Sequence, residues 1–172
     1  MSEETTVNEK TQPESRRFFI FFLAAAGVTA FDQWTKWLVR RDIPLNTPWL
    51  PEAMEWLLPY ARLLHIQNRG ASFGILQDGN LVFIALTLAI VAGILFYVAR
   101  FEHPSPWMWA AGGMYLGGAL GNLIDRLLFG AVTDFISVGT FYIFNIADAS
   151  INVSVAILIW MSILEARKPE AA

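Results

Sequence analysis

The chain has 172 residues, of which 55% are hydrophobic and 16% are charged, and its mean hydropathy is +0.45. This apolar share exceeds that of a typical soluble domain, so the composition favours an integral membrane protein. The formal net charge of -3 offers no basic surface for nucleic acid. Because the sequence contains no cysteine, it excludes disulfides and thiolate nucleophiles.

Residues 1–15, MSEETTVNEKTQPES, are polar and lack aromatic side chains, which predicts a disordered tail. The apolar stretch FFIFFLAAAGVTA begins shortly afterwards, behind Arg16 and Arg17. Because small residues follow at Val28-Thr29-Ala30, this stretch also resembles a cleaved signal peptide. Three further apolar segments would remain after such cleavage, so the chain is integral to the membrane on either reading.

Four segments approach the roughly 20 apolar residues that cross a bilayer core. The clearest is LVFIALTLAIVAGILFYVA, residues 81–99, which carries no charge. The other three carry polar groups near one end; they are residues 18–39, 106–128 and 141–164. We therefore expect an all-α integral membrane protein with a bundle of four transmembrane helices. The expected division is one membrane-embedded domain over residues 16–166 and a C-terminal tail over 167–172.

The only sizeable soluble part lies between the first two spans, at about residues 41–80. Its PWLPEAMEWLLPY stretch mixes tryptophan and leucine with Glu52 and Glu55, which is typical of a helix at the membrane interface. The segments ARLLHIQN and ASFGILQ have the composition of short strands, separated by Arg69 and Gly70. An ordinary amphipathic loop packed on the bundle and a platform for a substrate remain equally open here.

Basic residues near the span ends predict the orientation. Arg16 and Arg17 precede the first span, and Arg167 and Lys168 follow the last. Because both tails are basic, we expect both termini in the cytoplasm and the 41–80 segment outside.

The first span carries a polar stripe at helical spacings of three and four. Its members are Thr29, Asp32, Gln33, Lys36 and Arg40. Asp32 and Lys36 are four residues apart and can form an ion pair that makes two membrane-embedded charges tolerable. This pair can be purely structural, or it can also line a site.

The third and fourth spans carry polar faces of the same kind. Asn122, Asp125 and Arg126 share one face of the third span, and Asn145 and Asp148 share a face of the fourth. A separate stripe of small residues, the pattern that lets membrane helices pack closely, is formed by Gly113, Gly117 and Gly121. If successive helices alternate in direction, the polar ends of the first, third and fourth spans lie at the same membrane surface.

Serine and metal chemistry are poorly supported. The sequence GASFG, residues 70–74, matches the G-x-S-x-G pattern around Ser72. This pattern requires a strand-turn-helix elbow and a histidine base, whereas the two histidines, His65 and His103, are poorly placed for that role. With no cysteine and no H-E-x-x-H motif, a zinc site is less plausible still.

Two carboxylates remain as candidates for chemistry. Asp134 and Asp148 can meet at the mouth of the bundle, because residues 133–142 are long enough for a return turn. Two aspartates that share a proton in a site of low dielectric constant can activate water and protonate a carbonyl, as in aspartic proteolysis. Spacing alone leaves a proton or ion transporter and a purely structural role open as alternatives.

Four ordered sequence blocks resemble the lipoprotein signal peptidase family, signal peptidase II. They are FDQWTKWLV (31–39), NRGASFGIL (68–76), GNLIDRLLFGAVTDFI (121–136) and FNIADASI (144–151). The resemblance implies an intramembrane aspartic endopeptidase of the bacterial cytoplasmic membrane, with its active site near the extracytoplasmic face. The implied substrate is a prolipoprotein, cleaved before its diacylglyceryl-modified cysteine.

The resemblance also implies roles for particular residues. Asp134 and Asp148 match the two catalytic aspartates. The residues expected to bind the substrate or orient the site are Asp32, Lys36, Asn68, Gly70, Asn122, Arg126 and Asn145. We expect a structural role for Asp125, near a backbone or arginine partner. No cofactor or metal is expected, the only partners are the substrate and membrane lipid, and the protein is expected to be a monomer. The connection 135–147 is shorter than expected for the family.

Overall fold

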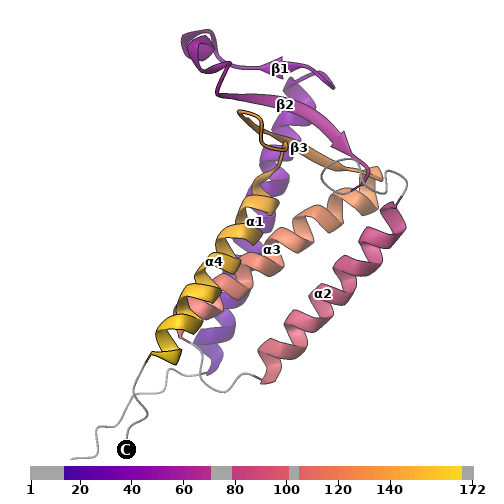
Figure 1. Ribbon diagram of the computed structural model, residues 1–172. Helices are drawn as coiled ribbons and strands as arrows, with labels where there is room; N and C mark the ends of the chain where they lie inside the picture. The colour runs from indigo at the N-terminus through magenta and orange to yellow at the C-terminus, as the bar shows by residue number, and fades with distance from the viewer. Residues whose placement is uncertain (1–13, 71–78, 101–104, 168–172) are drawn as a thin grey trace, which may run out of the picture.

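The computed structural model describes residues 14–70, 79–100 and 105–167. It has four α-helices: α1 (Glu14–Asp42), α2 (Asn80–Arg100), α3 (Pro106–Phe129) and α4 (Ile146–Ala166). Three strands, β1 (Pro48–Trp49), β2 (Ala61–Asn68) and β3 (Val132–Val138), accompany a 3-10 helix, η1 (Glu52–Leu57). The strands lie across one end of the helices, while α1 begins and α4 ends at the other (Figure 1).

Two of these helices are long and apolar enough to cross a membrane. They are residues 15–42 of α1 and the whole of α4, Ile146–Ala166. The apolar part of α2, Asn80–Phe96, is shorter. Large apolar side chains cover the outside of the bundle, for example Leu81 at 79% exposure and Trp160 at 62%. An apolar outer face of this kind is suited to contact with lipid.

The boundaries of α2 and α3 lie close to the predicted ones, because clear signals mark the ends of α3. The Ser105 hydroxyl accepts a hydrogen bond from the Met108 backbone N–H at 3.4 Å, and Pro106 opens the helix. Gly130 ends it with a φ of 69°, a left-handed conformation that glycine adopts without strain. The first helix is longer than its predicted span 18–39 and includes Glu14 and Ser15 of the predicted tail. Residues 1–13 and 168–172 of the two predicted tails lie outside the described residues.

The start of the fourth predicted span is wrong. Residues 141–145 are not helical, and α4 begins at Ile146 with Asn145 as its N-cap. The reason is that Phe144 pairs with Ile136 beside the sheet, where the Phe144 backbone N–H donates to the Ile136 carbonyl at 3.1 Å. A residue bound to an extended partner in this way cannot also belong to a helix. Most of the connection 135–147 therefore belongs to the end of β3 and to the turn that brings Phe144 back beside Ile136.

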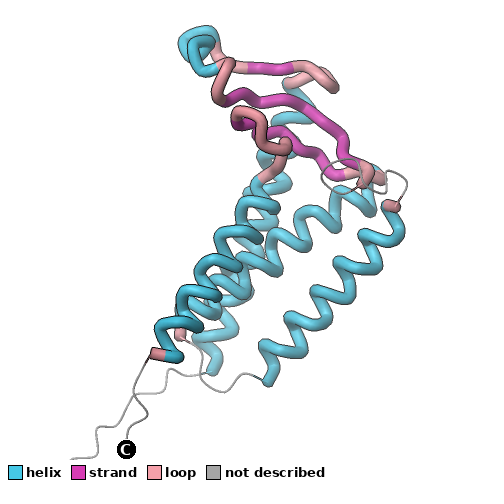
Figure 2. Tube along the Cα trace, in the orientation of Figure 1, coloured by secondary structure: helices cyan, strands magenta, loops and turns pink. Residues whose placement is uncertain are grey.

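The strands form one antiparallel sheet in the order β1-β2-β3, so the chain is mostly helical and not all-α (Figure 2). The boundaries of β2 confirm the strand predicted over ARLLHIQN, while the one predicted over ASFGILQ lies outside the described residues. Strand β3 was not predicted. Its pairing with β2 sets Ile66 opposite Asp134 and Asn68 opposite Val132. This register brings the end of β2 beside the aspartate of β3.

Helix α3 packs against each of the other three helices, and its glycines allow two of these contacts to be close. A Cβ atom at Gly117 would lie 2.6 Å from the Ala25 carbonyl oxygen of α1. A Cβ atom at Gly118 would lie 2.6 Å from the Ala147 carbonyl oxygen of α4. The predicted small-residue stripe therefore packs against α1, and Gly118 extends the close packing to α4.

Candidate active site

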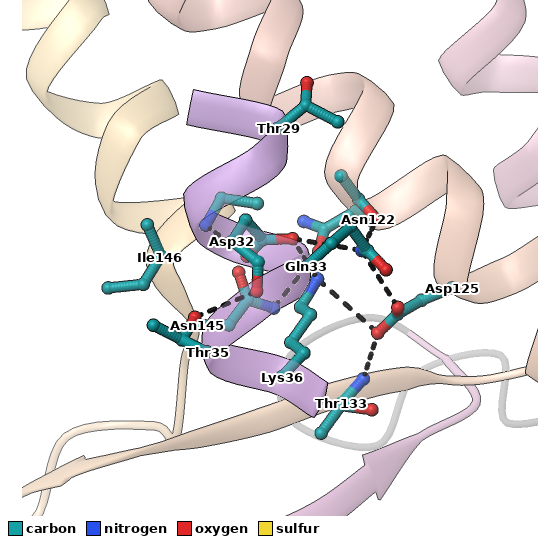
Figure 3. Close-up of polar contacts among 12 residues, drawn as sticks. Thr29, Asp32, Gln33, Thr35, Lys36, Asn122, Asp125, Thr133, Asn145 and Ile146 are labelled. Atoms are coloured by element: carbon teal, nitrogen blue, oxygen red, sulfur yellow. Dashed lines mark hydrogen bonds and ion pairs between the residues drawn. The ribbon is translucent and has the colours of Figure 1, made fainter. Parts of the chain in front are cut away.

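Polar side chains are buried together where α1, α3 and the start of α4 meet the sheet. The close-up in Figure 3 shows side chains of α1 facing α3 and the beginning of α4. The buried polar members of this layer are Asp32, Lys36, Asn122, Asp125, Thr133, Asp134 and Asn145. Such residues are costly inside a membrane protein unless each is paired.

Lys36 lies at the centre of this layer and is fully buried. Its ammonium contacts Asp32 Oδ2 at 2.8 Å and Asp125 Oδ2 at 3.5 Å. It also donates a hydrogen bond of 2.9 Å to Asn122 Oδ1. The predicted ion pair between Asp32 and Lys36 is therefore confirmed, and it belongs to a larger cluster.

Asp125 ties three elements together. Its Oδ2 accepts a hydrogen bond of 2.8 Å from the Thr133 backbone N–H of β3. Its Oδ1 lies 3.3 Å from a guanidinium nitrogen of Arg40, which also donates to Thr133 Oγ1 at 2.9 Å. The expected contacts of Asp125 with a backbone group and an arginine are both present. They hold β3 against α1 and α3.

The first turn of α4 has free backbone N–H groups, and side chains satisfy two of them. Asp32 Oδ1 accepts from the Ala147 N–H at 2.9 Å, and Asn145 Oδ1 accepts from the Asp148 N–H at 2.9 Å. In return, Asp148 Oδ2 accepts from the Asn145 backbone N–H at 3.3 Å, which completes a capping box. The position of Asp148 is therefore set by the way in which α4 begins.

Asp134 is 3% exposed and accepts hydrogen bonds on both carboxylate oxygens. Asn145 Nδ2 donates to Oδ1 at 2.7 Å, and Asn68 Nδ2 donates to Oδ2 at 3.0 Å. Burial and then the nearby charge of Asp148 raise the pKa of Asp134 to about 7, against the lowering effect of the two amide donors. Asp134 is thus a carboxyl group that can hold a proton near neutral pH.

Asp134 and Asp148 line one cavity of about 190 Å³ at this end of the bundle. Asn122 Nδ2 donates to Asp148 Oδ1 at 2.8 Å. Arg126 lines the same cavity, with its guanidinium carbon 5.2 Å from the centre of the Phe83 ring. The other lining residues are Asn68, Gly70, Val132 and Ile143. Two carboxylates, amide donors and one cation therefore surround a space large enough for several water molecules.

The chain is similar in sequence to members of a known family. The family model described as Signal peptidase (SPase) II matches residues 24–164. The lipoprotein signal peptidase of Geobacillus thermodenitrificans (strain NG80-2) is 42% identical over 147 residues, covering 83% of this chain and 88% of the relative. That of Streptococcus pneumoniae (strain ATCC BAA-255 / R6) is 38% identical over 130 residues, covering 74% and 82%. The chain belongs to the signal peptidase II family.

A solved structure of a bacterial membrane enzyme, determined by the in meso method at 2.3 Å resolution, is similar to this fold. Its TM-score is 0.78 at 28% sequence identity, over 88% of this chain and 92% of that chain. With membership of signal peptidase II, this similarity shows that the protein is a bacterial membrane enzyme. The family is one of peptidases, which decides against the transporter alternative.

The structure of this signal peptidase II brings most of the predicted site residues to one place. The residues that line the cavity are Asn68, Gly70, Asn122, Arg126, Asp134 and Asp148. Asn145 contacts Asp134 directly. Asp32 and Lys36 do not line the cavity: Lys36 donates to Asn122, which does, and Asp32 accepts from the backbone N–H of Ala147, the residue before Asp148. Phe83, Val132 and Ile143 also line it and were not predicted, because no sequence signal separates them from other apolar residues.

The alternative nucleophile cannot be placed, because Ser72 and His103 lie outside the described residues. His65 is buried, with its Nδ1 2.7 Å from the Ile43 carbonyl oxygen. This contact holds β2 against the end of α1. Within residues 14–70, 79–100 and 105–167, no cluster of acidic and histidine side chains has the composition of a metal site.

Proposed function

We propose that this enzyme removes the signal peptide of lipid-modified prolipoproteins, with Asp134 and Asp148 as its catalytic residues, by cleaving before the diacylglyceryl-modified cysteine. The observation that carries the proposal is that both carboxylates line one cavity and receive hydrogen bonds from the surrounding asparagines. The relatives named lipoprotein signal peptidase support the class of substrate.

The resting pair carries a single proton. Two carboxylates in one poorly solvated cavity repel each other, so ionisation of one disfavours ionisation of the other. The raised pKa of Asp134 agrees with this arrangement. A singly ionised pair together with Arg126 has no net charge, so the cavity holds its catalytic groups without an unbalanced buried charge.

Each carboxyl group then has a separate task in hydrolysis. The ionised aspartate takes a proton from water as the water oxygen attacks the scissile carbonyl carbon, and the neutral aspartate gives its proton to the carbonyl oxygen. In the second step, a hydroxyl group of the tetrahedral intermediate gives its proton to the ionised aspartate, the C–N bond breaks, and the leaving nitrogen takes a proton from the neutral aspartate. The products are a carboxylic acid and an amine, and the pair again holds a single proton.

The position of the site suits a lipid-anchored substrate. The residues that line the cavity belong mainly to the end of β2, the last third of α3, β3 and the first turn of α4. These segments meet at the end of the bundle where the sheet lies (Figure 1). A cysteine with two acyl chains keeps its peptide bond close to the bilayer surface, because the chains remain in the hydrocarbon. The exposed apolar residues of the bundle provide a surface beside which these chains can lie.

The proposed topology has four membrane crossings formed by α1, α2, α3 and α4. The beginning of α1 and the end of α4 lie at the same end of the bundle, away from the sheet (Figure 1). Since Arg16, Arg17, Arg167 and Lys168 flank these ends, the positive-inside rule places both termini in the cytoplasm. The sheet and active site then face the extracytoplasmic side. Residues 16–166 form a single peptidase domain that acts as a monomer.

Mass spectrometry of the products tests the substrate and the cleavage position. Detergent-purified enzyme is incubated with a diacylglyceryl-modified prolipoprotein and, separately, with the same protein lacking the lipid. We expect cleavage of the modified protein alone, giving a product that begins at the modified cysteine. Cleavage at another bond, or equal cleavage of both proteins, contradicts the proposal.

A further inference from the structure

We propose that Lys36 is a positioning residue for the catalytic pair: its ammonium fixes the orientation of the Asn122 side-chain amide so that Asn122 donates to Asp148. Lys36 acts through Asn122 and does not touch either catalytic carboxylate. The proposal rests on the proposed function, because it assigns a role in maintaining Asp148 as the ionised member of the pair.

An asparagine amide can donate or accept depending on which way it is turned, so its orientation must be set by its partners. For Asn68 and Asn145, backbone groups set it. The Gly70 N–H donates to Asn68 Oδ1 at 3.0 Å, and the Asp148 N–H donates to Asn145 Oδ1 at 2.9 Å. Each amide therefore presents its NH₂ group to Asp134.

For Asn122, side chains set the orientation. The ammonium of Lys36 has three hydrogens and no acceptor, so the group that faces it at 2.9 Å must be the Asn122 carbonyl oxygen. The NH₂ group then faces Asp148 Oδ1 at 2.8 Å. If the amide turned over, an NH₂ group would meet an ammonium and a carbonyl oxygen would meet a carboxylate. Both contacts would be repulsive.

Asn145 also donates to Asn122 Oδ1, at 3.1 Å, but the same nitrogen serves Asp134 at 2.7 Å. The bond from Lys36 is charge-assisted, and such bonds are roughly twice as strong as neutral ones. It also polarises the Asn122 amide, which strengthens the hydrogen bond that Asn122 donates. Lys36 is therefore the main determinant of the Asn122 orientation.

Asp148 has the surroundings of an ionised carboxylate. It accepts from Asn122 and from the Asn145 backbone N–H, and it lies in the first turn of α4, where the helix dipole favours negative charge. Asp134 is more deeply buried in a strand. We therefore assign the proton to Asp134 and the role of base to Asp148.

Charged groups from several elements surround Lys36 and the pair. They are Asp32 and Arg40 of α1, Asp125 and Arg126 of α3, Asp134 of β3 and Asp148 of α4. Removing Lys36 alone takes the ammonium away from the buried carboxylates of Asp32 and Asp125 and changes the electrostatic field at the pair. A test must therefore keep the total charge of the cluster constant.

The double variant Asp32→Asn/Lys36→Met meets this requirement, because it removes one negative and one positive charge. The single variant Asp32→Asn is the matched control, since it retains the bond between Lys36 and Asn122. Both are compared with wild type and with Asn122→Ala by measuring kcat/KM for prolipoprotein cleavage as a function of pH, together with thermal stability at each pH. Asp148→Asn serves as the test of the underlying mechanism.

We expect the double variant to lose activity at a higher pH on the acid side of the profile, by about one pH unit, because the base has lost a hydrogen bond to its ionised form. Asp32→Asn alone does not produce this upward movement. Asn122→Ala produces it, and introducing Asp32→Asn and Lys36→Met together in the Asn122→Ala background adds nothing further.

The role of Lys36 is overturned if the double variant is folded and loses activity on the acid side at the same pH as wild type. This holds even if its rate is lower at every pH. If the charge-neutral pair of substitutions at Asp32 and Lys36 raises the pH of activity loss further in the Asn122→Ala background, Lys36 does not act through Asn122. If Asp148→Asn still cleaves, the proposed catalytic pair itself is wrong, which separates failure of the proposed function from failure of this inference.

Discussion

Asn145 donates a hydrogen bond of 2.7 Å to Asp134 while its side-chain oxygen caps α4 at the Asp148 N–H. One side chain thus joins the aspartate of a strand to the aspartate of a helix. The two residues lie far enough apart in the sequence to be positioned independently, so this amide sets their relative placement. Its two functions, capping and donation, can be separated experimentally.

Asn145→Ser separates them. Serine is as good an N-cap as asparagine, but its short side chain does not reach Asp134. We expect the melting temperature to fall only slightly, whereas cleavage falls by up to about tenfold, the usual effect of losing a hydrogen bond to a neutral carboxyl group.

Asn145→Ala serves as its partner, because it removes both the cap and the donor. It is expected to show the same loss of cleavage and an additional loss of about 1 kcal/mol in the free energy of unfolding. Equal cleavage by Asn145→Ser and wild type would show that the bond to Asp134 is unimportant.

Stability is expected to depend on pH through Asp134. A folded-state pKa of about 7, above the ordinary value of 3.8, means that the folded state holds this proton more tightly than the unfolded chain. The resulting stabilisation is fully present below about pH 4 and is lost as the pH rises through about 7. Thermal melts of wild type and Asp134→Asn over this range should therefore show a shallower decline in the variant. Parallel declines would mean that other groups dominate.

Activity is also expected to fall on the alkaline side. If Asp134 supplies the proton to the scissile carbonyl, its loss near pH 7 removes the acid from the pair. The rate of cleavage should decline as the pH rises through this value, with the enzyme still folded. A rate that continues to rise well above neutral pH would instead indicate that the proton comes from another group.

Close packing of α3 on α4 is expected to be necessary for activity. In Gly118→Ala, the new methyl group would lie 2.6 Å from the Ala147 carbonyl oxygen and 2.8 Å from Ile151 Cγ1. Because Ala147 precedes Asp148, relief of this clash moves a proposed catalytic residue. We expect a loss of about 1–3 kcal/mol in stability and a marked loss of cleavage.

Gly27→Ala is the matched control for this helix contact. Beyond the neighbouring backbone of its own helix, no atom lies within 4 Å of a Cβ at Gly27, so the same substitution in α1 should preserve both properties. If the two variants behave alike, tight packing at Gly118 has no special role.

The buried ion pair should matter far more for folding than the exposed one. Lys36→Met leaves Asp32 buried without its cation and leaves Asp125 with Arg40 alone, and breaking a buried pair typically costs about 3–5 kcal/mol. Asp42→Asn removes the pair between Arg41 and Asp42, whose side chains are each 52% exposed, and should change stability little. Thermal melts in detergent provide the comparison. Similar losses of thermal stability in Lys36→Met and Asp42→Asn would contradict the claim that the buried cluster stabilises the fold.

The predicted helices were largely recovered, because apolar length and capping residues determine them locally. The start of α4 is the exception. The predicted span treated apolar residues 141–144 as helix, whereas Asn145 followed by Asp148 is a capping-box pattern that indicates a start at Ile146. The pairing of Phe144 with Ile136 keeps the apolar residues 141–144 out of the helix.

Strand β3 was missed for a different reason. Its sequence, VTDFISV, is rich in β-branched residues and is followed by Gly139, which is a strand signal. It lies between two predicted spans, however, and its partner β2 is distant in the sequence. Without that pairing, the contact of Asn68 with Asp134 could not be predicted.

The candidate site was predicted better as a set of residues than as a network. Helical spacing placed Asp32, Lys36 and Asn122 on inward faces, and their contacts agree with that placement. The bond from Ala147 to Asp32 depends on how α1 and α4 pack, which residue spacing within either helix does not specify.

The most direct test of the central claim is the rate at which Asp134→Asn and Asp148→Asn cleave a diacylglyceryl-modified prolipoprotein. Asp42→Asn provides the same substitution at an exposed position and should retain the wild-type rate. We predict that both catalytic variants melt cooperatively, as the folded wild type does, and show no measurable cleavage. Substantial cleavage by either folded variant would contradict the assignment of Asp134 and Asp148 as the catalytic pair.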